Sequence, residues 1–220
     1  MSDKRVAIIA NGSFQPGGPV QSCLEQADII ICADGGADHA LKLGILPHVL
    51  LGDFDSISPQ TRKILQDQGV ELVSFSPVKD KTDTELAVEF AVKAGAREIF
   101  LLGATGSRLD HSLANLYLLF KAAHLGVKLS LVDRVNQVWL VEKEISLRGS
   151  RGQYLSLLPL SPQVTGVTTR GLKYPLKGAT LVWGSSWGVS NEFLDSEAGV
   201  TLAKGQLLVI QIWEPPDQTK

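Results

Sequence analysis

Continuous apolar runs of four to six residues recur along the first 135 positions, and polar or glycine-containing turns separate them. Runs of this kind predict strands that are buried on both faces, as in a parallel sheet. We expect six such strands, at 6–10, 29–33, 48–51, 70–75, 99–102 and 129–132. Helical segments alternate with these runs, so this part of the chain is predicted to be α/β, with a mostly parallel sheet and helices on both faces.

Cap residues indicate where the intervening helices begin. Ser58 followed by Pro59 is a typical helix start. Residues 82–85, Thr-Asp-Thr-Glu, fit a capping box and place Asp83 in the first turn of the next helix. An amphipathic helix is expected after residue 108, with one apolar face made by Leu113, Leu116, Tyr117 and Phe120.

The pattern changes after Asp133. Short apolar or alternating runs are now separated by Gly, Pro and Ser, which is typical of a small antiparallel β-sandwich or barrel. The clearest runs lie at 138–141, 154–158, 164–169 and 207–213. We therefore expect two domains, an α/β domain at 1–135 and a smaller antiparallel β-sandwich at 136–220.

Composition adds a few limits. The 220 residues carry a formal net charge of −2, which gives no reason to expect a nucleic acid or a membrane as partner. The only cysteines, Cys23 and Cys32, fit no disulfide or metal-binding spacing, which favours a reducing compartment. No apolar run has the length of a membrane span or a signal segment. We expect a soluble, cytoplasmic protein.

Two carboxylates follow the third predicted strand. If the segment stays extended, Asp53 and Asp55 point to the same side and Phe54 points towards the core. Carboxylates held this close repel each other unless a cation lies between them, and Mg²⁺ suits one or two carboxylates plus substrate phosphates. A solvated turn in which an Asp caps the following helix explains the same residues. Both interpretations stay open on this segment alone.

The other polar clusters also follow predicted strands, and the carboxyl ends of parallel strands form the usual ligand-binding edge of such a sheet. They lie at 11–12, 34–36, 53–55, 80–83 and 103–110. So many acidic groups at one edge favour a divalent cation. Lys79, Lys81 and Arg108 are suited to phosphate oxygens at the same edge.

The glycine loop at 103–108 is compatible with anion binding at a helix N-terminus, but it is not a Walker A loop. No G-x-G-x-x-G follows the first strand, which argues against a nicotinamide cofactor. His111 is a candidate general base, although a helix N-terminal histidine satisfied by its neighbours explains it better. Residues 185–191 form either a turn or a lip over an aromatic substrate.

Taken together, these motifs resemble the thiamine pyrophosphokinase family over most of the chain. The matching segments, in order, are Ala-Asp-Gly-Gly-Ala at 33–37, Gly-Asp-Phe-Asp-Ser at 52–56, Lys-Asp-Lys-Thr-Asp-Thr-Glu at 79–85, 103–115, Gly-Leu-Lys-Tyr-Pro-Leu at 171–176 and Gly-Val-Ser-Asn-Glu-Phe at 188–193. One departure is Ser107, which stands where the family usually has a second consecutive glycine. This departure affects the backbone conformation of the glycine loop at 103–108.

The resemblance implies an α/β domain followed by a β-sandwich, a homodimer, and Mg²⁺-dependent transfer of diphosphate from ATP to thiamine with release of AMP. It implies Asp53, Asp55 and Asp83 as metal ligands and, with Arg108, as the catalytic set, and it gives Asp80 and Asp110 a supporting role. The nucleotide-binding residues that it implies are Asp34, Gly35, Gly36, Lys81, Thr82, Gly106, Arg108 and Asp110. For thiamine it implies Trp187, Ser190 and Asn191.

Three alternatives remain at the level of sequence. The same chemistry on another primary alcohol, such as a hydroxymethylpterin, would use the same acidic motifs. A phosphatase with an Asp-x-Asp nucleophile is disfavoured, because the pair follows the third strand and lacks the expected flanking sequence. A non-catalytic nucleotide-binding regulator would leave the acidic set unexplained.

Overall fold

The computed structural model describes residues 4–78 and 80–213. Over this part of the chain the protein forms two compact units, Met1–Arg134 and Val135–Lys220. Lys79, which the sequence suggests as a phosphate contact, lies outside the described residues.

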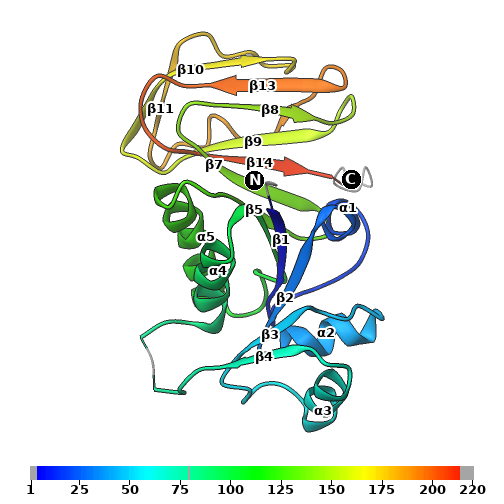
Figure 1. Ribbon diagram of the computed structural model, residues 1–220. Helices are drawn as coiled ribbons and strands as arrows, with labels where there is room; N and C mark the ends of the chain where they lie inside the picture. Colours follow the sequence, from blue (N-terminus) through cyan, green and yellow to red (C-terminus); the bar gives the residue numbers. More distant parts are fainter. Residues whose placement is uncertain (1–3, 79, 214–220) are drawn as a thin grey trace. The chain divides into compact units, whose positions relative to one another are not determined.

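Six parallel strands form the sheet of the first unit, in the order β6-β5-β1-β2-β3-β4 (Figure 1). They are β1 (Lys4–Ile9), β2 (Ile29–Ala33), β3 (Val49–Gly52), β4 (Glu71–Ser74), β5 (Ala96–Leu102) and β6 (Lys128–Val132). Each corresponds to one predicted apolar run. The order reverses at β1, since β2, β3 and β4 lie on one side of it and β5 and β6 on the other. Ligands of open α/β sheets usually bind beside such a reversal.

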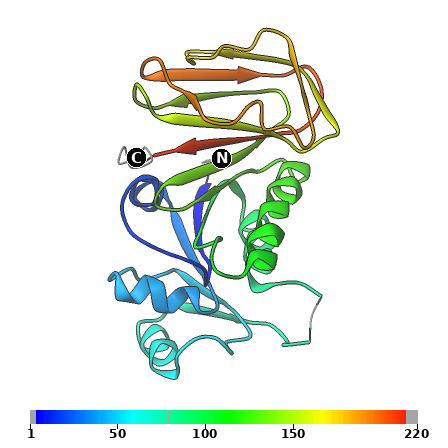
Figure 2. The same cartoon turned by 180° about the vertical axis from the view of Figure 1, so that it is seen from behind.

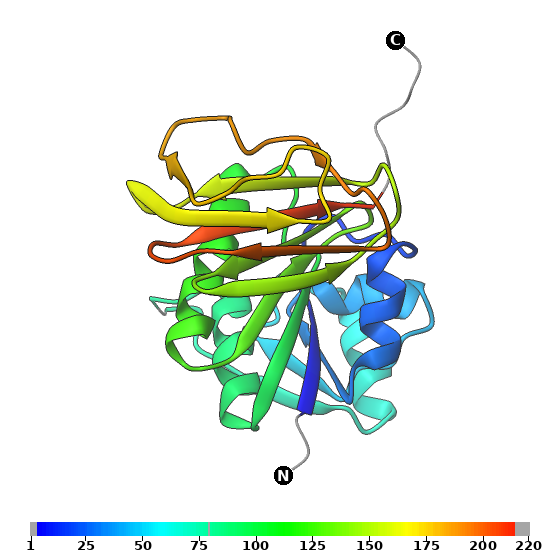
Figure 3. The ribbon, with the colours of Figure 1, turned by 90° about the horizontal axis from the view of Figure 1, so that it is seen from above.

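Five helices cover this sheet in the described part of the first unit: α1 (Pro19–Gln26), α2 (Gly36–Lys42), α3 (Pro59–Asp67), α4 (Asp83–Lys93) and α5 (Leu109–His124). Figure 3 shows α4 and α5 on one face and α1, α2 and α3 on the other, which confirms the predicted arrangement. The two predicted caps are also confirmed. Ser58 Oγ accepts a hydrogen bond from the Thr61 N–H at 3.1 Å, and Thr82 Oγ1 accepts one from the Glu85 N–H at 3.2 Å.

The strands are apolar throughout because both faces of the sheet are covered. Ile8, Ile9, Leu50, Leu51 and Leu101 are completely buried. Burial of each such side chain contributes about 1.5–3 kcal/mol relative to exposure. The central strands are therefore rigid supports, and the polar residues that follow them are held in fixed positions.

The predicted face of α5 is wrong. Leu113 and Tyr117 are exposed, and Leu116 and Phe120 are only partly buried. The residues that α5 buries are Asn115, Leu118, Leu119 and Ala122. The Nδ2 of Asn115 donates a hydrogen bond of 2.8 Å to the carbonyl oxygen of Ala104 in the glycine loop. The buried face thus combines this polar contact with the apolar side chains of Leu118, Leu119 and Ala122.

Two antiparallel sheets form the second unit and face each other across a hydrophobic core (Figures 1 and 2). One sheet has the order β12-β9-β14-β7 and the other β11-β10-β13-β8. The strands are β7 (Asn136–Val141), β8 (Glu144–Arg148), β9 (Tyr154–Pro159), β10 (Gln163–Arg170), β11 (Ala179–Val182), β12 (Asn191–Glu192), β13 (Glu197–Thr201) and β14 (Leu207–Ile212). The expected antiparallel β-sandwich is confirmed.

None of the helices in the described residues is both long enough and apolar enough to cross a membrane.

Candidate active site

The polar clusters of the first unit meet at the carboxyl edge of its sheet. At the end of β2, the Asp34 N–H donates a hydrogen bond of 2.8 Å to the Leu51 carbonyl oxygen of β3. Beyond β1, the Gly12 N–H donates one of 2.8 Å to the Gly103 carbonyl oxygen, which follows β5. Segments that are as far as 91 residues apart in the sequence are thereby joined along one edge.

Three carboxylates gather at this edge. Asp34, Asp53 and Asp83 each offer one oxygen, and the three oxygens lie within 4.8 Å of one another. They come from the end of β2, the end of β3 and the first residue of α4. Asp34 is buried, while Asp53 and Asp83 are partly exposed. Such a set of hard oxygen donors fits a divalent cation such as Mg²⁺.

Asp55 lies outside this group. β3 ends at Gly52, and Phe54 has a φ of 65°, so the segment is not extended and Asp53 and Asp55 do not alternate as in a strand. The Asp55 N–H instead donates a hydrogen bond of 3.3 Å to Asp53 Oδ1, and the exposed Asp55 carboxylate accepts one of 2.8 Å from Ser56 Oγ. The solvated turn and the acidic cluster are thus parts of the same loop.

The buried carboxylate of Asp34 has one oxygen without a partner. Its Oδ2 accepts a hydrogen bond of 3.2 Å from the Ser56 N–H, whereas its Oδ1 is buried and has no hydrogen bond in the described structure. Burial raises the pKa of Asp34, and so do the negative charges of Asp83 and Asp55, against hydrogen bonds from Ser56 and Gly35. A cation would satisfy this oxygen and relieve the repulsion.

Gly52 leaves the room that this cluster needs. Its φ is 152°, and a Cβ atom at this position would lie 3.1 Å from the Asp34 Cβ and 3.3 Å from Asp83 Oδ1. A side chain here would push against two of the three carboxylates. The glycine between β3 and Asp53 is therefore part of the site.

The glycine loop after β5 packs directly against the segment after β1. The Ser13 N–H donates a hydrogen bond of 2.6 Å to the Thr105 carbonyl oxygen, and a Cβ on Gly12 would lie 2.3 Å from that same oxygen. The Gly106 N–H donates a hydrogen bond of 3.2 Å to Ser112 Oγ of α5. This loop is held on one side by backbone hydrogen bonds from Gly12 and Ser13 and on the other by the Ser112 hydroxyl.

The other predicted glycines lie at the start of α2. Gly35 and Gly36 are buried, and a Cβ on Gly35 would come within 2.5 Å of the Asn11 side chain. A Cβ on Gly36 would lie 2.1 Å from the Ile9 carbonyl oxygen. Both glycines thus allow α2 to begin directly against the end of β1.

The predicted cations at this edge pair with nearby carboxylates. Lys81 Nζ contacts the two carboxylate oxygens of Glu89 at 2.8 and 3.0 Å, beside the helix cap Thr82. Arg108 binds Asp110 through two hydrogen bonds of 3.1 and 2.6 Å, and both side chains are exposed. The hydrogen bonds from Arg108 lower the pKa of Asp110. An exposed pair of this kind is weak and open to exchange with a phosphate.

In the second unit, the predicted substrate residues lie in and after a turn. Trp187 is 62% exposed, and the exposed Ser190 has a φ of 60° and donates its N–H to Ser156 Oγ at 3.0 Å. Asn191 is buried, and its side chain binds the backbone of Tyr174, accepting from the N–H at 3.0 Å and donating to the carbonyl at 2.7 Å. Asn191 therefore fixes a neighbouring segment.

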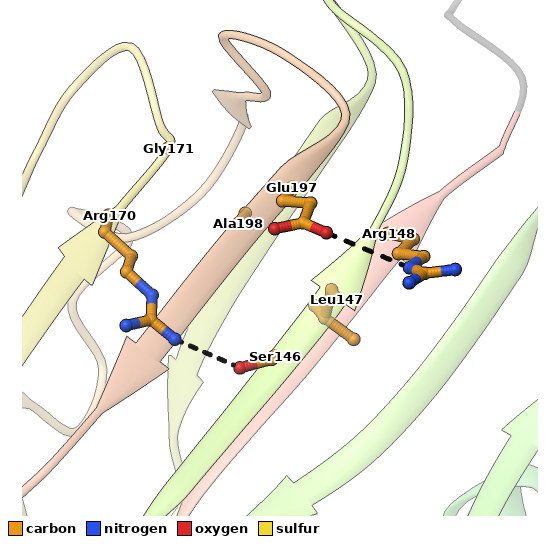
Figure 4. Close-up of a pocket in the computed structure, with 7 residues that line it drawn as sticks. All are labelled: Ser146, Leu147, Arg148, Arg170, Gly171, Glu197 and Ala198. Atoms are coloured by element: carbon orange, nitrogen blue, oxygen red, sulfur yellow. Dashed lines mark hydrogen bonds and ion pairs between the residues drawn. The ribbon is translucent and has the colours of Figure 1, made fainter.

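A cavity of about 470 Å³ opens on the solvent side of β8, β10 and β13 (Figure 4). It contains none of the predicted site residues. Arg170 Nη2 donates a hydrogen bond of 3.2 Å to Ser146 Oγ, and Arg148 Nε lies 3.9 Å from Glu197 Oε1, with both side chains exposed. This is a solvent-exposed sheet face whose ion pair contributes little to stability.

Family models match both units. The thiamin pyrophosphokinase catalytic domain matches residues 20–131, and the thiamin pyrophosphokinase vitamin B1 binding domain matches residues 142–207. The chain belongs to the thiamine pyrophosphokinase family. A curated relative, thiamine pyrophosphokinase from Bacillus subtilis, is 31% identical over 94% of this chain and 98% of its own length.

Solved structures of the thiamine pyrophosphokinase family share this fold. The crystal structure of the Bacillus subtilis protein covers 96% of this chain and 100% of its own, with a TM-score of 0.85 and 29% identity. The structure of thiamin pyrophosphokinase from Geobacillus thermodenitrificans covers 96% and 99%, with a TM-score of 0.83 and 30% identity. Both similarities extend over the two units, as the sequence motifs predict.

The family's catalytic-domain match contains every predicted metal and nucleotide residue, and its vitamin B1 binding match contains Trp187, Ser190 and Asn191. The sequence motifs assign Asp34 to the nucleotide alone and do not reveal its place beside Asp53 and Asp83. A signal was present, because Asp34 ends a buried strand in the same way as Asp53. Only the pairing of β2 with β3 shows that the two ends are neighbours.

Proposed function

We propose that this chain is a thiamine pyrophosphokinase that transfers the diphosphate group of ATP to the hydroxyl of thiamine, giving thiamine diphosphate and AMP. The observation that carries the proposal is the match of both family domains to one chain whose sheet edge holds three convergent carboxylates. A phosphate-transferring site needs such groups to hold the cation that neutralises phosphate charge.

Mg²⁺ is the cation that we propose for this site. The unpartnered buried oxygen of Asp34 and the neighbouring oxygens of Asp53 and Asp83 form a donor set that fits it. Asp55 would join them after a change of the loop, or bind through water. When bound, Mg²⁺ supplies charge neutralisation on the phosphate oxygens and on the departing AMP.

The chain's own residues would hold the nucleotide on either side of this cluster. Lys81 and Arg108 are the proposed phosphate contacts, and each is now paired with an exchangeable carboxylate partner, Glu89 or Asp110. The nucleotide would approach the protein backbone closely at the sheet edge, at Gly35, Gly36, Thr82 and Gly106. We name no general base, because positioning and charge stabilisation account for most of the catalysis of phosphoryl transfer.

The second unit is proposed to bind thiamine. Trp187 offers an exposed aromatic face, and Ser190 an exposed hydroxyl. A cationic thiazolium ring favours such an aromatic face. Asn191 would act by holding the segment around Tyr174. Thiamine and ATP are thus the proposed partners.

We further propose a cytoplasmic homodimer. The two cysteines, Cys23 and Cys32, are both buried and unpaired, which suits a reducing compartment. Light scattering of the purified protein, combined with size-exclusion chromatography, measures the oligomeric state directly. A mass of about 47 kDa, twice the 23.7 kDa of one chain, is the expected result.

One assay tests the activity. Purified protein is incubated with ATP, Mg²⁺ and thiamine, and the products are quantified by chromatography. AMP and thiamine diphosphate are expected in equal amounts. ADP, inorganic phosphate alone, or turnover with a hydroxymethylpterin but not with thiamine would contradict the proposal. Omission of Mg²⁺ with excess EDTA is expected to stop the reaction.

A further inference from the structure

The carboxylate of Asp38, on the first turn of α2, binds the start of α3 through three hydrogen bonds. Its Oδ2 accepts the Ser58 N–H at 3.1 Å, and its Oδ1 accepts Ser58 Oγ at 3.0 Å and also Thr61 Oγ1. Hydrogen bonds to a charged acceptor are about twice as strong as neutral ones. Asp38 thus binds α3 firmly, although it belongs to neither the acidic cluster nor the glycine loop.

The loop that carries Asp53 is held at two points by carboxylates four residues apart. The Ser56 N–H binds Asp34, and the Ser58 N–H binds Asp38. Since Asp34 and Asp38 flank the start of α2, that helix serves as a fixed support for residues 53–58.

α3 extends this support to the turn itself. Ser58 is the N-cap of α3, and Arg62 on its first turn places its guanidinium 4.7 Å from the centre of the Phe54 ring. Phe54 has a left-handed backbone conformation, which costs energy and needs surrounding contacts to persist. Movement of α3 would remove one of those contacts, and the loop between Asp53 and Ser56 would relax.

We infer that Asp38 is a positioning residue for the cation site: by holding Ser58 and α3, it fixes the loop that presents Asp53 to Asp34 and Asp83. The identity of the cation rests on the proposed function, whereas the effect of Asp38 on Ser58 and the loop does not. Asp38 touches neither cation nor substrate in this role. Its loss would therefore weaken cation binding while the chemical step at saturating cation persists.

Asp38→Ala is the main test, and Asp28→Ala is its matched control. Asp28 also accepts a backbone N–H, from Arg5 at 2.8 Å, but it lies at the amino end of β2, away from the site. The first readout is amide hydrogen exchange of Asp55 and Ser56 in metal-free protein, because neither amide touches Asp38. We expect these amides to exchange at least about tenfold faster in Asp38→Ala and unchanged in Asp28→Ala.

The second readout is the dissociation constant for Mn²⁺ alone, measured by electron paramagnetic resonance of the free ion. We expect it to rise about fivefold or more in Asp38→Ala, with kcat at saturating Mg²⁺ within about twofold of wild type. Ser58→Ala removes one of the three contacts and is a milder change. It replaces Asp38→Ala if that variant folds poorly, and it should shift both readouts in the same direction.

Unchanged exchange at Asp55 and Ser56 would overturn the inference, since Asp38 would then only cap α3. An equal rise of the Mn²⁺ dissociation constant in Asp28→Ala would also overturn it, because the effect would reflect general stability. Absence of Mn²⁺ binding to the wild-type protein counts against the proposed cation site instead. Amide exchange at Asp55 and Ser56 then still tests whether Asp38 holds the loop.

Discussion

The side-chain amide of Asn191 binds both the N–H and the carbonyl group of Tyr174, at 3.0 and 2.7 Å. The same Oδ1 also accepts the Glu192 N–H at 2.9 Å. A single buried side chain thereby joins β12 to the segment after β10, which are 17 residues apart in the sequence. The contact makes Asn191 a structural support of the proposed thiamine site.

Asn191→Ala is expected to lower the free energy of unfolding by about 2–3 kcal/mol, because it leaves buried backbone groups without partners. The KM for thiamine should rise several-fold more than the KM for ATP. Urea denaturation and steady-state kinetics measure the two effects. Gln206→Ala is the control, since it removes a surface amide contact to Glu142 in the same unit. An equal rise in both KM values would contradict a local role for Asn191.

The acidic cluster is tested by single amide substitutions. Asp83→Asn should lower kcat/KM by about 100-fold or more and raise the Mg²⁺ concentration needed for half-maximal rate, because one negative oxygen donor is lost. Asp67→Asn, at the end of α3, is the control and should be neutral.

Asp55→Asn tests the one predicted ligand that lies outside the observed group. We expect it to abolish turnover while circular dichroism and the unfolding midpoint stay near those of wild type. Retention of most activity would remove Asp55 from the cation site and leave it as a residue of the turn.

Gly52→Ala places a methyl group against Asp34 and Asp83 and should raise the Mg²⁺ requirement at least about tenfold. Gly69→Ala is the matched control, because Gly69 also has a positive φ, of 75°, but a Cβ there would meet nothing within 4 Å. Both variants carry backbone strain and are expected to lose stability, by about 1 kcal/mol. Activity titrated against Mg²⁺ separates them, and similar titration curves would argue against the proposed crowding at Gly52.

The ion-pair network of α4 and α5 predicts a pH dependence of stability. Hydrogen bonds from Lys121 and Lys81 lower the pKa of Glu89 below its usual 4.5. Between the native pKa of Glu89 and about pH 4.5, the unfolded chain therefore binds more protons than the folded chain. The stabilisation by charged Glu89 is present above about pH 4.5 and is lost as the pH falls through the native pKa. The same network raises the pKa of Lys121, so that its charge persists at alkaline pH.

Glu89→Gln should accordingly lower the free energy of unfolding by about 0.5–1 kcal/mol at pH 7, since the pair is partly exposed, and by much less at pH 3. Urea denaturation of both proteins at the two pH values measures the difference. Glu144→Gln, at an exposed position of β8, is the control. A difference that is as large at pH 3 as at pH 7 would mean that packing, rather than charge, is lost.

The sequence predicts this fold well where burial alone decides the pattern. The run at 29–33 is apolar because both faces of β2 are covered, and it matches the strand residue for residue. The Thr82 cap is equally local, because the hydroxyl and the N–H that it binds are three residues apart. Such features need no knowledge of the rest of the chain.

Features that depend on tertiary contacts are harder to predict from the sequence. α5 has apolar residues on two faces, and hydrophobicity alone does not decide that the face with Asn115 and Leu119 is the buried one. The membership of Asp34 in the cluster follows from strand pairing, and the turn at Phe54 lies against Arg62 of α3. The motifs indicated the right edge of the sheet, but not which oxygen atoms converge there.

The strand order has a consequence for how the site assembles as the chain folds. The three carboxylates come from residues 34 to 83, so their strands and helix can associate over short loops. The glycine loop reaches its place only when β5 pairs with β1, for example Val6 with Ile99, which closes a loop of more than 90 residues. Long loop closure is slow and entropically costly. On a ribosome, β5 begins only 13 residues after Asp83, so the acidic half of the site and the strand that completes it would be synthesised in direct succession.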